Sequence, residues 1–359
     1  MAEAAHEQKH KGSQKKAVAL ISGGLDSMLA AKVIMEQDVH VEGINFFTGF
    51  CVEGHTHAIR SSQQNKPKRN NALWVAEQLG MKLHIVDVIE EYKDVLLHPK
   101  YGYGQHLNPC LDCKIFMVKK ALAWTFMEEH DFDFIITGEV IGQRPKSQRK
   151  ATMPIIARES GADDRLLRPL CAKNLPPTLP EREGWVDREA LYDFQGRNRK
   201  PQIALAESFG FSDWAQPAGG CCFLTDEQYV RKLADLWASN ASRDYELDDI
   251  MLLKVGRHIR PAPNFKVIVG RDEGENNYLE GYRHQFAALR ATSHKGPLCL
   301  IDGTPQADDV DLAARILGRY CQGKNAAEIT AEIVFPDGEV RELIARPLLP
   351  HEIDQGWHV

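Results

Sequence analysis

Two adjacent glycines near the start of the chain stand between a short apolar run and a segment with apolar residues at helical spacing. The apolar run is residues 17–21, and Ser22-Gly23-Gly24-Leu25-Asp26-Ser27 follows it directly. Glycine lets a backbone turn tightly and approach an anion, and the helix that follows presents free N–H groups and a positive dipole end to that anion. Segment 22–27 therefore predicts a strand-to-helix loop that binds phosphate.

The side chains of this loop suit a nucleotide. Ser22 and Ser27 offer hydroxyl donors, and Asp26 is able to cap the helix or to orient Mg²⁺. The loop lacks the lysine of a Walker A sequence, so transfer of a terminal phosphoryl group is not the predicted chemistry. A plain strand-to-helix turn without a ligand is the structural alternative.

Strand and helix patterns alternate after this loop. Strands are expected at residues 41–46, 83–88 and 133–138, and helices at 70–80 and 115–130. Alternation of this kind predicts an α/β fold with a doubly wound parallel sheet. Ligands of such sheets bind at the carboxyl ends of the strands.

The chain divides into three parts by pattern. Residues 1–16 are polar and are expected to form a disordered basic tail. Residues 17–226 form the expected catalytic domain, which includes the basic, Pro-rich region 143–216. A smaller α/β domain is expected at 240–359. Its pattern predicts strands at 251–257, 266–270 and 297–303, a helix at 278–289, and a hairpin at 331–343 with Asp337-Gly338 at its turn.

Composition limits the classes of protein. A net charge of −6 argues against a uniformly basic nucleic-acid coat but leaves room for local basic surfaces. Eight cysteines in a long chain without an export signal predict metal binding or catalysis rather than disulfides. No run approaches the roughly 18 consecutive apolar residues of a membrane helix. We therefore expect a cytoplasmic protein without membrane contact.

Cysteines gather in two places. Cys110 and Cys113 precede a helix expected to begin near Lys114, which would lower their thiol pKa. Alone, this pair fits a redox couple, half of a zinc site or part of an iron–sulfur site. Gly219-Gly220-Cys221-Cys222-Phe223 offers a third thiol. The remaining cysteines are isolated in sequence and are expected to be structural: Cys51, Cys171, Cys299 and Cys321.

Segment 22–27 resembles the SGGxDS signature of the PP-loop (N-type ATP pyrophosphatase) superfamily, and Thr137-Gly138-Glu139 resembles its second marker. The resemblance covers residues 17–226. It implies that ATP and Mg²⁺ bind there and that a carbonyl oxygen of the substrate is adenylated. The residues implied in nucleotide binding are Ser22, Gly23, Gly24, Asp26, Ser27, Thr137 and Gly138.

The cysteine segments resemble those of tRNA thiolation enzymes within this superfamily, the 2-thiouridylases and 4-thiouridine synthetases. Residues 108–113 are similar to their N-P-D-x-x-C loop, with Cys110 in place of the acid, and residues 220–223 are similar to their G-x-C-F segment. The departure implies a cluster-dependent enzyme, with a [4Fe-4S] cluster on Cys110, Cys113 and Cys222 (or Cys221). A persulfide relay between Cys113 and Cys222, and zinc, remain alternatives. Asp112 is able to relay a proton or to cap the helix.

The implied substrate is a uridine of tRNA, and a sulfur donor, either sulfide or a persulfide-carrying protein, must supply the sulfur. Basic loops are candidates for the phosphate contacts of the RNA, although solvated loops are the simpler reading of each. The first two groups are Arg144, Lys146, Arg149, Lys150 and Arg197, Arg199, Lys200. Further cations are Arg60, Lys66, Lys68, Arg69 and Arg168.

The terminal domain carries two further motifs. Residues 255–258 and 269–277 resemble motifs of the NFACT-R domain of RNA-binding quality-control proteins, which implies that this domain docks tRNA. A purely structural domain is the alternative. His258 is expected to be a hydrogen-bonded histidine rather than a ligand.

Two other functions compete with thiolation. PP-loop amide or nitrile synthases bind zinc through four close cysteines, whereas only Cys110 and Cys113 are close here. A non-catalytic RNA-binding protein with a vestigial nucleotide fold is disfavoured because segment 22–27 is intact.

Overall fold

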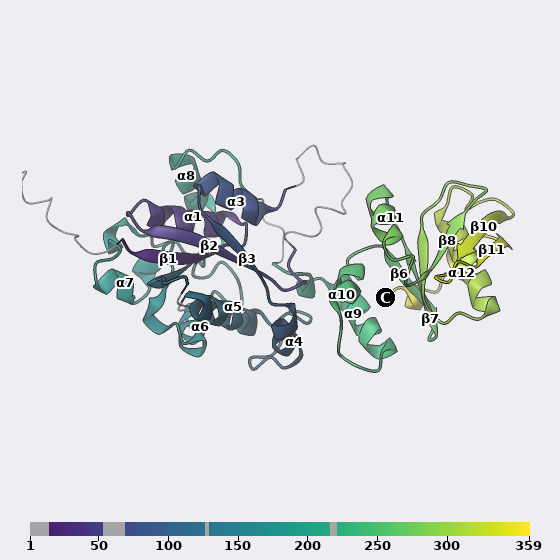
Figure 1. Cartoon of the computed structure of the whole chain (residues 1–359), viewed down its shortest axis with the longest axis horizontal. Helices are drawn as coiled ribbons and strands as arrows, with labels where there is room; N and C mark the ends of the chain where they lie inside the picture. Colours follow the sequence, from purple (N-terminus) through teal and green to yellow (C-terminus); the bar gives the residue numbers. More distant parts are fainter. Residues whose placement is uncertain (1–13, 53–68, 126–128, 216–220) are drawn as a thin grey trace, which may run out of the picture. The chain divides into compact units, whose positions relative to one another are not determined.

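The structure is a computed structural model, which describes residues 14–52, 69–125, 129–215 and 221–359 (Figure 1). The chain divides into two compact units, and the division in sequence falls between Cys221 and Cys222. Within the described residues, no helix is both long enough and apolar enough to span a membrane. Arg60, Lys66 and Lys68 lie outside the described residues.

The described strands of the first unit form a parallel five-stranded sheet of order β3-β2-β1-β4-β5. The strands are β1 (Lys16–Leu20), β2 (His40–Phe47), β3 (Leu83–Asp87), β4 (Phe134–Thr137) and β5 (Leu166–Leu167). The chain leaves β1 toward β2 on one side, and β4 lies on the other side. This reversal of strand order next to β1 is the position where doubly wound sheets bind their ligands. The predicted fold class is confirmed.

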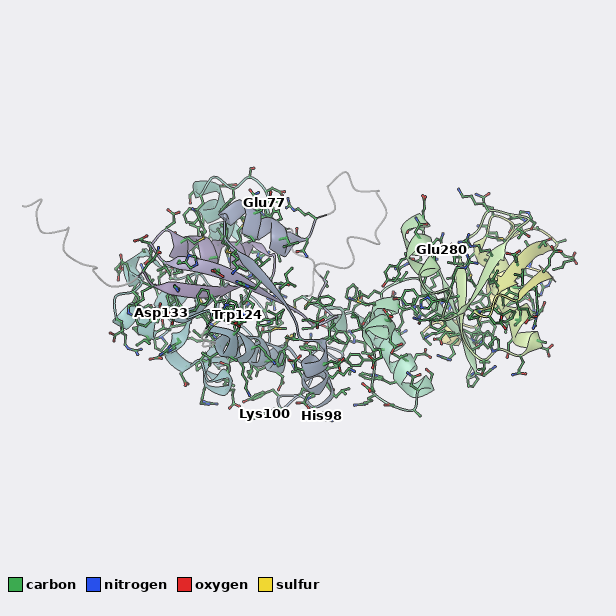
Figure 2. All side chains as sticks on the ribbon, in the orientation of Figure 1. Glu77, His98, Lys100, Trp124, Asp133 and Glu280 are labelled. Atoms are coloured by element: carbon green, nitrogen blue, oxygen red, sulfur yellow. The ribbon has the colours of Figure 1, made fainter. Side chains whose placement is uncertain are left out.

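Helices cover both faces of this sheet. One apolar core joins β1 and β4 to α1 (Leu25–Met35), α3 (Asn71–Leu79) and α8 (Lys200–Ser208). A second core joins the opposite face to α5 (Cys110–Thr125) and α6 (Met153–Ser160). Trp124, labelled in Figure 2, stacks on His130 at 3.9 Å between ring centroids and anchors the far end of α5. The strands are thus buried on both faces, as parallel sheets require. The remaining helices of the unit are α4 (Ile89–Leu97) and α7 (Leu179–Arg182).

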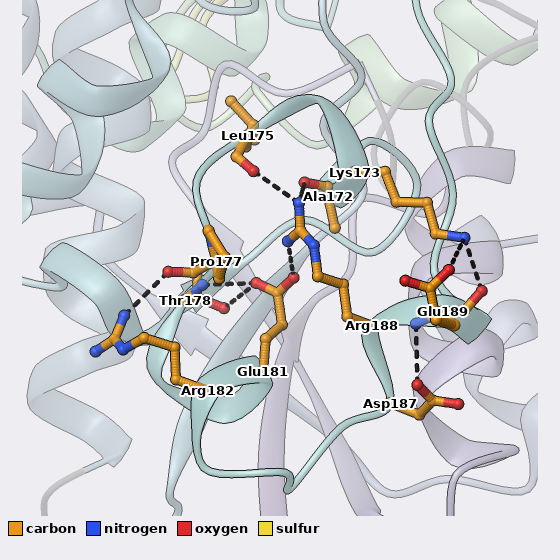
Figure 3. A network of polar contacts seen from close by, with 10 residues as sticks. All are labelled: Ala172, Lys173, Leu175, Pro177, Thr178, Glu181, Arg182, Asp187, Arg188 and Glu189. Atoms are coloured by element: carbon orange, nitrogen blue, oxygen red, sulfur yellow. Dashed lines mark hydrogen bonds and ion pairs between the residues drawn. The ribbon is translucent and has the colours of Figure 1, made fainter.

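A partly buried polar network links the short helices of the Pro-rich segment after β5 (Figure 3). The carboxylate of Glu181 accepts hydrogen bonds from the backbone N–H and the hydroxyl of Thr178, at 2.7 and 2.6 Å. Arg188 pairs with the same carboxylate and donates to the carbonyl oxygens of Ala172 and Leu175 at 3.1 and 2.9 Å. The guanidinium group thus gives a hydrogen-bond partner to two carbonyls of this segment, although the carbonyl of Ala172 also accepts from the backbone N–H of Leu175 at 2.9 Å in a short 3₁₀ helix.

The second unit contains an antiparallel six-stranded sheet of order β11-β10-β8-β9-β7-β6 among its described residues. Its strands are β6 (Arg257–Ala262), β7 (Phe265–Val269), β8 (Ala287–Ala291), β9 (Cys299–Gly303), β10 (Ile329–Val334) and β11 (Val340–Ala345). Its helices are α9 (Glu227–Ser239), α10 (Leu247–Leu252), α11 (Glu273–Glu280) and α12 (Ala307–Tyr320). Helix α12 packs on one face of the sheet, and residues of α10 and α11 pack on the other.

Several expected element boundaries differ from the structure. The predicted tail, residues 1–16, lies outside the described residues as far as residue 13. Its predicted end does not hold, because Lys16 begins β1 and Asp133, labelled in Figure 2, binds both Lys15 and the Lys16 backbone N–H. The expected strand at 251–257 is the end of α10 and a turn, since short apolar runs do not distinguish strand from helix. The expected helix at 278–289 divides into α11, which Asp272 caps, and β8. The hairpin is confirmed, with Gly338 at its turn.

Candidate active site

The glycine loop between β1 and α1 is packed against two neighbouring segments. Gly23 has φ +78°, and a Cβ atom there would lie 2.8 Å from the backbone nitrogen of Ala72 in α3. A Cβ atom on Gly138, in the turn after β4, would lie 2.5 Å from the backbone nitrogen of Ser27. Only glycine permits these approaches. The two predicted nucleotide markers, segment 22–27 and Thr137-Gly138, therefore touch each other.

Ser27 fixes the loop from inside. Its hydroxyl donates to the carbonyl oxygen of Gly24 at 2.8 Å and accepts from the backbone N–H of Ser22 at 3.3 Å. The Ser22 hydroxyl lies 3.4 Å from the hydroxyl oxygen of Ser27. Ser27 is buried. Its hydroxyl thus holds the conformation of a loop whose backbone faces the start of α1.

Asp26 is the charged group of the loop, and it is paired. Its Oδ2 atom accepts hydrogen bonds from Nε2 of Gln143 at 2.5 Å and from a terminal nitrogen of Arg199 at 2.6 Å. Arg199, which the sequence assigns to an RNA surface, is therefore turned toward the nucleotide loop. Exposed neighbours flank both partners: Arg144 follows Gln143, and Lys200 follows Arg199.

The acid of the second marker is buried beside the loop. Glu139 accepts from the hydroxyl of Thr137 at 3.1 Å and from the guanidinium group of Arg168 at 2.9 Å. Burial opposes its ionisation, but Arg168 and Lys114 together lower the pKa of Glu139 below the ordinary value. Arg168 is 5% exposed. The predicted contact of Arg168 with RNA phosphate is therefore wrong, because its guanidinium group is buried and forms an ion pair with Glu139.

Helix α5 begins at Cys110, so both thiols of the Cys-x-x-Cys pair lie in its first turn rather than before it. Asn108 caps this start through its side-chain oxygen, which accepts from the backbone N–H of Cys110 at 3.3 Å. Asp112 accepts from the backbone N–H of Tyr101 at 3.1 Å and so holds the preceding loop. A proton relay through Asp112 stays a prediction.

Thiols from three segments interact near the start of α5. The Cys110 thiol hydrogen-bonds with the thiol of Cys221, and the Cys113 thiol hydrogen-bonds with the hydroxyl of Tyr92. Cys51 interacts electrostatically with Cys113. The carbonyl oxygen of Cys221 accepts from the backbone N–H of Val52 at 3.3 Å, which holds Cys221 beside the segment after β2. The structure therefore brings Cys110, Cys113 and Cys221 together.

The thiol pKa values move opposite to the expected direction. The hydrogen bond to Cys221 and burial raise the pKa of Cys110, and burial raises the pKa of Cys113 to about 12. Arg144 and Lys114 act in the other direction on Cys110 and Cys113 respectively, without reversing the shift. The expectation of lowered pKa values from the helix start is wrong for these thiols, because loss of water and neighbouring thiols outweigh the helix dipole.

The metal prediction is not confirmed. Across the described residues, no group of three or more His, Cys, Asp or Glu side chains is arranged to hold a metal ion. Cys222, the preferred third ligand, belongs to the second unit, whereas Cys221 belongs to the first. Cys171 and Cys299 are buried, as expected of structural cysteines. Cys110, Cys113 and Cys221 thus offer the ligand type of an iron–sulfur centre, but in the described part of the chain they are not arranged as a metal site.

Comparison with known proteins agrees with this geometry. Residues 15–163 match the family model described as tRNA methyl transferase HUP domain. The match includes both nucleotide markers and the Cys-x-x-Cys pair. Residues 15–163 of the first unit are thus similar to a HUP domain. Residues 256–358 match a second model, described as NFACT protein RNA binding domain.

Curated proteins similar to this chain include tRNA-specific 2-thiouridylases. The MnmA protein of Mesoplasma florum is 26% identical over 259 residues, which are 68% of this chain and 65% of that protein. The MnmA protein of Petrotoga mobilis is 30% identical over 229 residues, 62% of this chain and 59% of that protein. The chain thus spans just under two thirds of these relatives.

Among solved structures, a 4-thiouridine synthetase in complex with RNA and bound ATP is 24% identical, with a TM-score of 0.32. The likeness covers 43% of this chain and 36% of that chain.

Most predicted RNA contacts of the PP-loop domain are exposed. This group comprises Arg144, Lys146, Arg149, Lys150, Arg197 and Lys200. Lys146 donates to the carbonyl oxygen of Tyr103 at 2.5 Å and Arg149 to that of Pro145, and neither forms an ion pair with an acid in the described part of the chain. Arg69 is instead engaged, since it pairs with Asp213 at 2.8 Å and lies over the ring of Trp74.

The second motif of the NFACT-type domain braces the fold. Arg271 pairs with Glu275, and Asn276 accepts from the backbone N–H of Leu298 at 3.0 Å. A Cβ atom on Gly270 would lie 2.1 Å from the side-chain oxygen of Asn276. His258 is buried, its Nε2 lies 2.9 Å from the carbonyl oxygen of Val255, and burial lowers its pKa well below the usual range. The prediction of a hydrogen-bonded histidine is confirmed.

Three residues of the site were not predicted from the sequence. Gln143 binds Asp26, Tyr92 binds the Cys113 thiol, and Lys114 acts on both Cys113 and Glu139. The spacing of Lys114 was a usable signal, because it stands four residues after Cys110 and so shares its helix face. Gln143 and Tyr92 carried no local signal, since their partners are distant in sequence.

Proposed function

We propose that this chain is an ATP-dependent tRNA sulfurtransferase, which adenylates a uridine carbonyl and replaces its oxygen by sulfur. Two consecutive residues carry the proposal. Gln143 hydrogen-bonds to Asp26 in the nucleotide loop, and Arg144 acts electrostatically on the Cys110 thiol. A nucleotide bound at the loop therefore lies in the same region as the gathered thiols.

The reaction needs both halves of this site. A uridine carbonyl oxygen is a poor leaving group, so it first attacks the α-phosphorus of ATP and pyrophosphate leaves. The loop and the start of α1 stabilise the charge of the pyrophosphate, and Asp26 would hold an Mg²⁺ ion, which would supply further positive charge there. Sulfide then forms the C–S bond, and AMP leaves with the original oxygen. A persulfide sulfur forms the same bond only if a second cysteine thiol then breaks the S–S bond, which leaves a disulfide that an external thiol must reduce before the next turnover. The burial of Cys113 fits this step, because water competes for the activated carbon.

Sulfur delivery is assigned to Cys110, Cys113 and Cys221. A [4Fe-4S] cluster on three thiolates would supply an open iron that carries sulfide. Cys221 is preferred to Cys222 as the third ligand, because its thiol hydrogen-bonds with that of Cys110. A persulfide relay remains the second candidate mechanism, favoured by the direct contact between the thiols of Cys110 and Cys221. The cluster route draws on free sulfide, whereas the persulfide route needs a persulfide-carrying protein, because free sulfide does not form a persulfide without an oxidant.

The substrate is assigned to tRNA on two grounds. Exposed cations without acidic partners follow the β4 turn, and cationic loops supply most non-specific affinity for RNA. The match of residues 256–358 to an RNA-binding domain adds a second contact region. The names of the curated relatives point to a uridine.

The decisive experiment is mass spectrometry of tRNA nucleosides from cells that lack the gene. We expect 4-thiouridine or a 2-thiouridine derivative to disappear and to return with the wild-type gene. Persistence of all thiouridines in the deletion strain would refute the proposal.

Cysteine variants separate the two sulfur mechanisms. Protein purified without oxygen is compared as wild type, C110A, C113A, C221A and C222A, with C299A as a control for a buried cysteine of the second unit. A cluster predicts absorbance near 400 nm that C110A, C113A and C221A lose and C222A and C299A keep. Colourless, iron-free wild-type protein that still thiolates tRNA would establish the persulfide route.

A further inference from the structure

The polar contacts of Asp26 continue beyond its two direct partners. Gln143 donates to Asp26, and its own side-chain oxygen accepts from Nε2 of Gln202 at 3.0 Å. Gln202 comes from α8 and is 1% exposed. Arg199 stands just before α8 and reaches the same carboxylate oxygen. Asp26 is thus held, directly or through Gln143, by side chains that lie far along the chain. Gln143 is 117 residues after Asp26, and Gln202 is 176 residues after it.

This network is incomplete among the described residues. Oδ1 of Asp26, Nε of Arg199 and Oε1 of Gln202 are buried and have no hydrogen-bond partner. A buried polar atom without a partner costs about 1–3 kcal/mol. Three such atoms beside an anion-binding loop indicate that a polar ligand completes the network. An acceptor atom of a phosphate fits Nε of Arg199, and a cation fits Oδ1 of Asp26.

The charge of Asp26 poses a problem for a phosphate ligand. Its carboxylate is 14% exposed and stands in the first turn of α1, where a triphosphate would also bind. Two anions at one helix end repel each other in a partly desolvated site. Arg199, itself 24% exposed, removes that repulsion by its contact with Oδ2.

We propose that Arg199 is a positioning residue of the nucleotide site, which holds and neutralises Asp26 so that the triphosphate of ATP can approach the glycine loop. The proposal deepens the proposed function, since it rests on ATP binding at that loop. Arg199 thereby leaves the set of RNA contacts. The RNA surface retains its exposed neighbours Arg197 and Lys200.

The test measures ATP affinity by calorimetry, without tRNA, in EDTA and in excess MgCl₂. In R199Q the Asp26 charge is uncompensated, so metal-free ATP should bind at least tenfold more weakly, about 1.4 kcal/mol. Mg·ATP should lose less, about threefold, because Mg²⁺ replaces part of the missing positive charge. R199K keeps the charge and should fall between the wild type and R199Q.

A double variant gives the sharpest result. In D26N/R199Q the repelling carboxylate is gone, and metal-free ATP should again bind within about threefold of the wild type. R158Q, at an exposed cation of α6 outside the proposed binding surfaces, should leave both ATP affinities within twofold. A general structural defect would weaken both forms of ATP equally, and D26N would not rescue it.

Three outcomes overturn the inference. Equal losses for metal-free and Mg-bound ATP in R199Q, no loss in R199Q, or no recovery in D26N/R199Q each refute it while the wild type binds ATP. If R199Q does not fold, R199K decides, and an affinity for metal-free ATP equal to the wild type refutes the need for the guanidinium contacts. Failure of the wild-type protein to bind ATP would instead refute the proposed function.

Discussion

Three glycines of the nucleotide site should respond differently to a single added methyl group. Gly138→Ala places a Cβ atom 2.4 Å from the backbone carbonyl carbon of Asp26, and Gly23→Ala places one 2.8 Å from the backbone of α3. Gly24→Ala meets only the Ser22 hydroxyl, at 3.6 Å, and the backbone of Gly24 has φ −87°. Substitution at Gly23 and Gly138 therefore requires backbone movement, whereas Gly24 has room.

The magnitudes follow from these contacts. Overpacking costs about 1–3 kcal/mol, and G138A should reach the upper part of that range because backbone must move. G23A adds about 1–2 kcal/mol for a left-handed conformation, so its total is about 2–5 kcal/mol. G24A should change stability by less than about 1 kcal/mol. It should still weaken ATP, because the methyl group stands where phosphate approaches the loop.

The assay must report on the first unit alone, because the chain has two compact units. Hydrogen–deuterium exchange of peptides from β1 and α1, followed over a urea series, gives local unfolding free energies. A loss of 2 kcal/mol corresponds to roughly 4–8 °C in melting temperature for a unit of this size. ATP affinity is measured on the same samples.

The contrast between G24A and G138A is the test of the reasoning. If G24A destabilises the first unit as much as G138A, or if G138A is neutral, the close contact between the two markers does not exist as described. If G24A binds ATP as tightly as the wild type, phosphate does not approach the loop at Gly24.

Three other predictions concern buried ionisable groups. At pH 8, iodoacetamide should modify Cys113 far more slowly in native than in urea-unfolded protein, because a pKa of about 12 rather than 9 leaves about a thousandfold less thiolate; peptide mass spectrometry showing equal rates in the two states would contradict this. Arg168→Met should destabilise the first unit by about 3–5 kcal/mol in urea unfolding at pH 7, because it leaves the Glu139 charge buried without its partner. The pKa of Glu139 is lowered in the folded state, so the ion pair contributes stability above pH 4.5, the ordinary pKa of a glutamate. The difference in unfolding free energy between wild type and variant should therefore shrink as the pH falls below 4.5. Burial lowers the pKa of Lys232 to about 8, so the folded second unit disfavours the charged amine and its stability should rise from pH 8 toward 10.5, a slope that K232M should lack.

Local pattern was sufficient for the nucleotide loop and for the parallel sheet. Segment 22–27 and the alternation of strands and helices depend on spacing along the chain, which is visible in the sequence. The same holds for the 337–338 turn of the second unit. Boundaries failed where apolar runs were short, as at 251–257, because tertiary pairing decided between helix and strand.

The pKa values of the thiols in the site could not be predicted from the local sequence pattern. The sequence placed Cys110 and Cys113 beside a helix start, which by itself lowers a thiol pKa. The tertiary structure reversed this direction, since it buries Cys113 and sets Cys221 against Cys110 from more than a hundred residues away. Burial is a property of the packed chain and has no signature at a single position.

What the sequence by itself determined is the chemistry offered by this protein: a glycine loop for phosphate, a group of thiols, and cations on polar loops. Only the tertiary structure decided which of these groups meet. In the folded chain, Arg199 pairs with Asp26, Arg168 pairs with Glu139, and the thiol of Cys221 contacts that of Cys110. The physical reason is that such pairs form between segments brought together by the packing of helices on the sheet, and their energies depend on distance and exposure rather than on order along the chain.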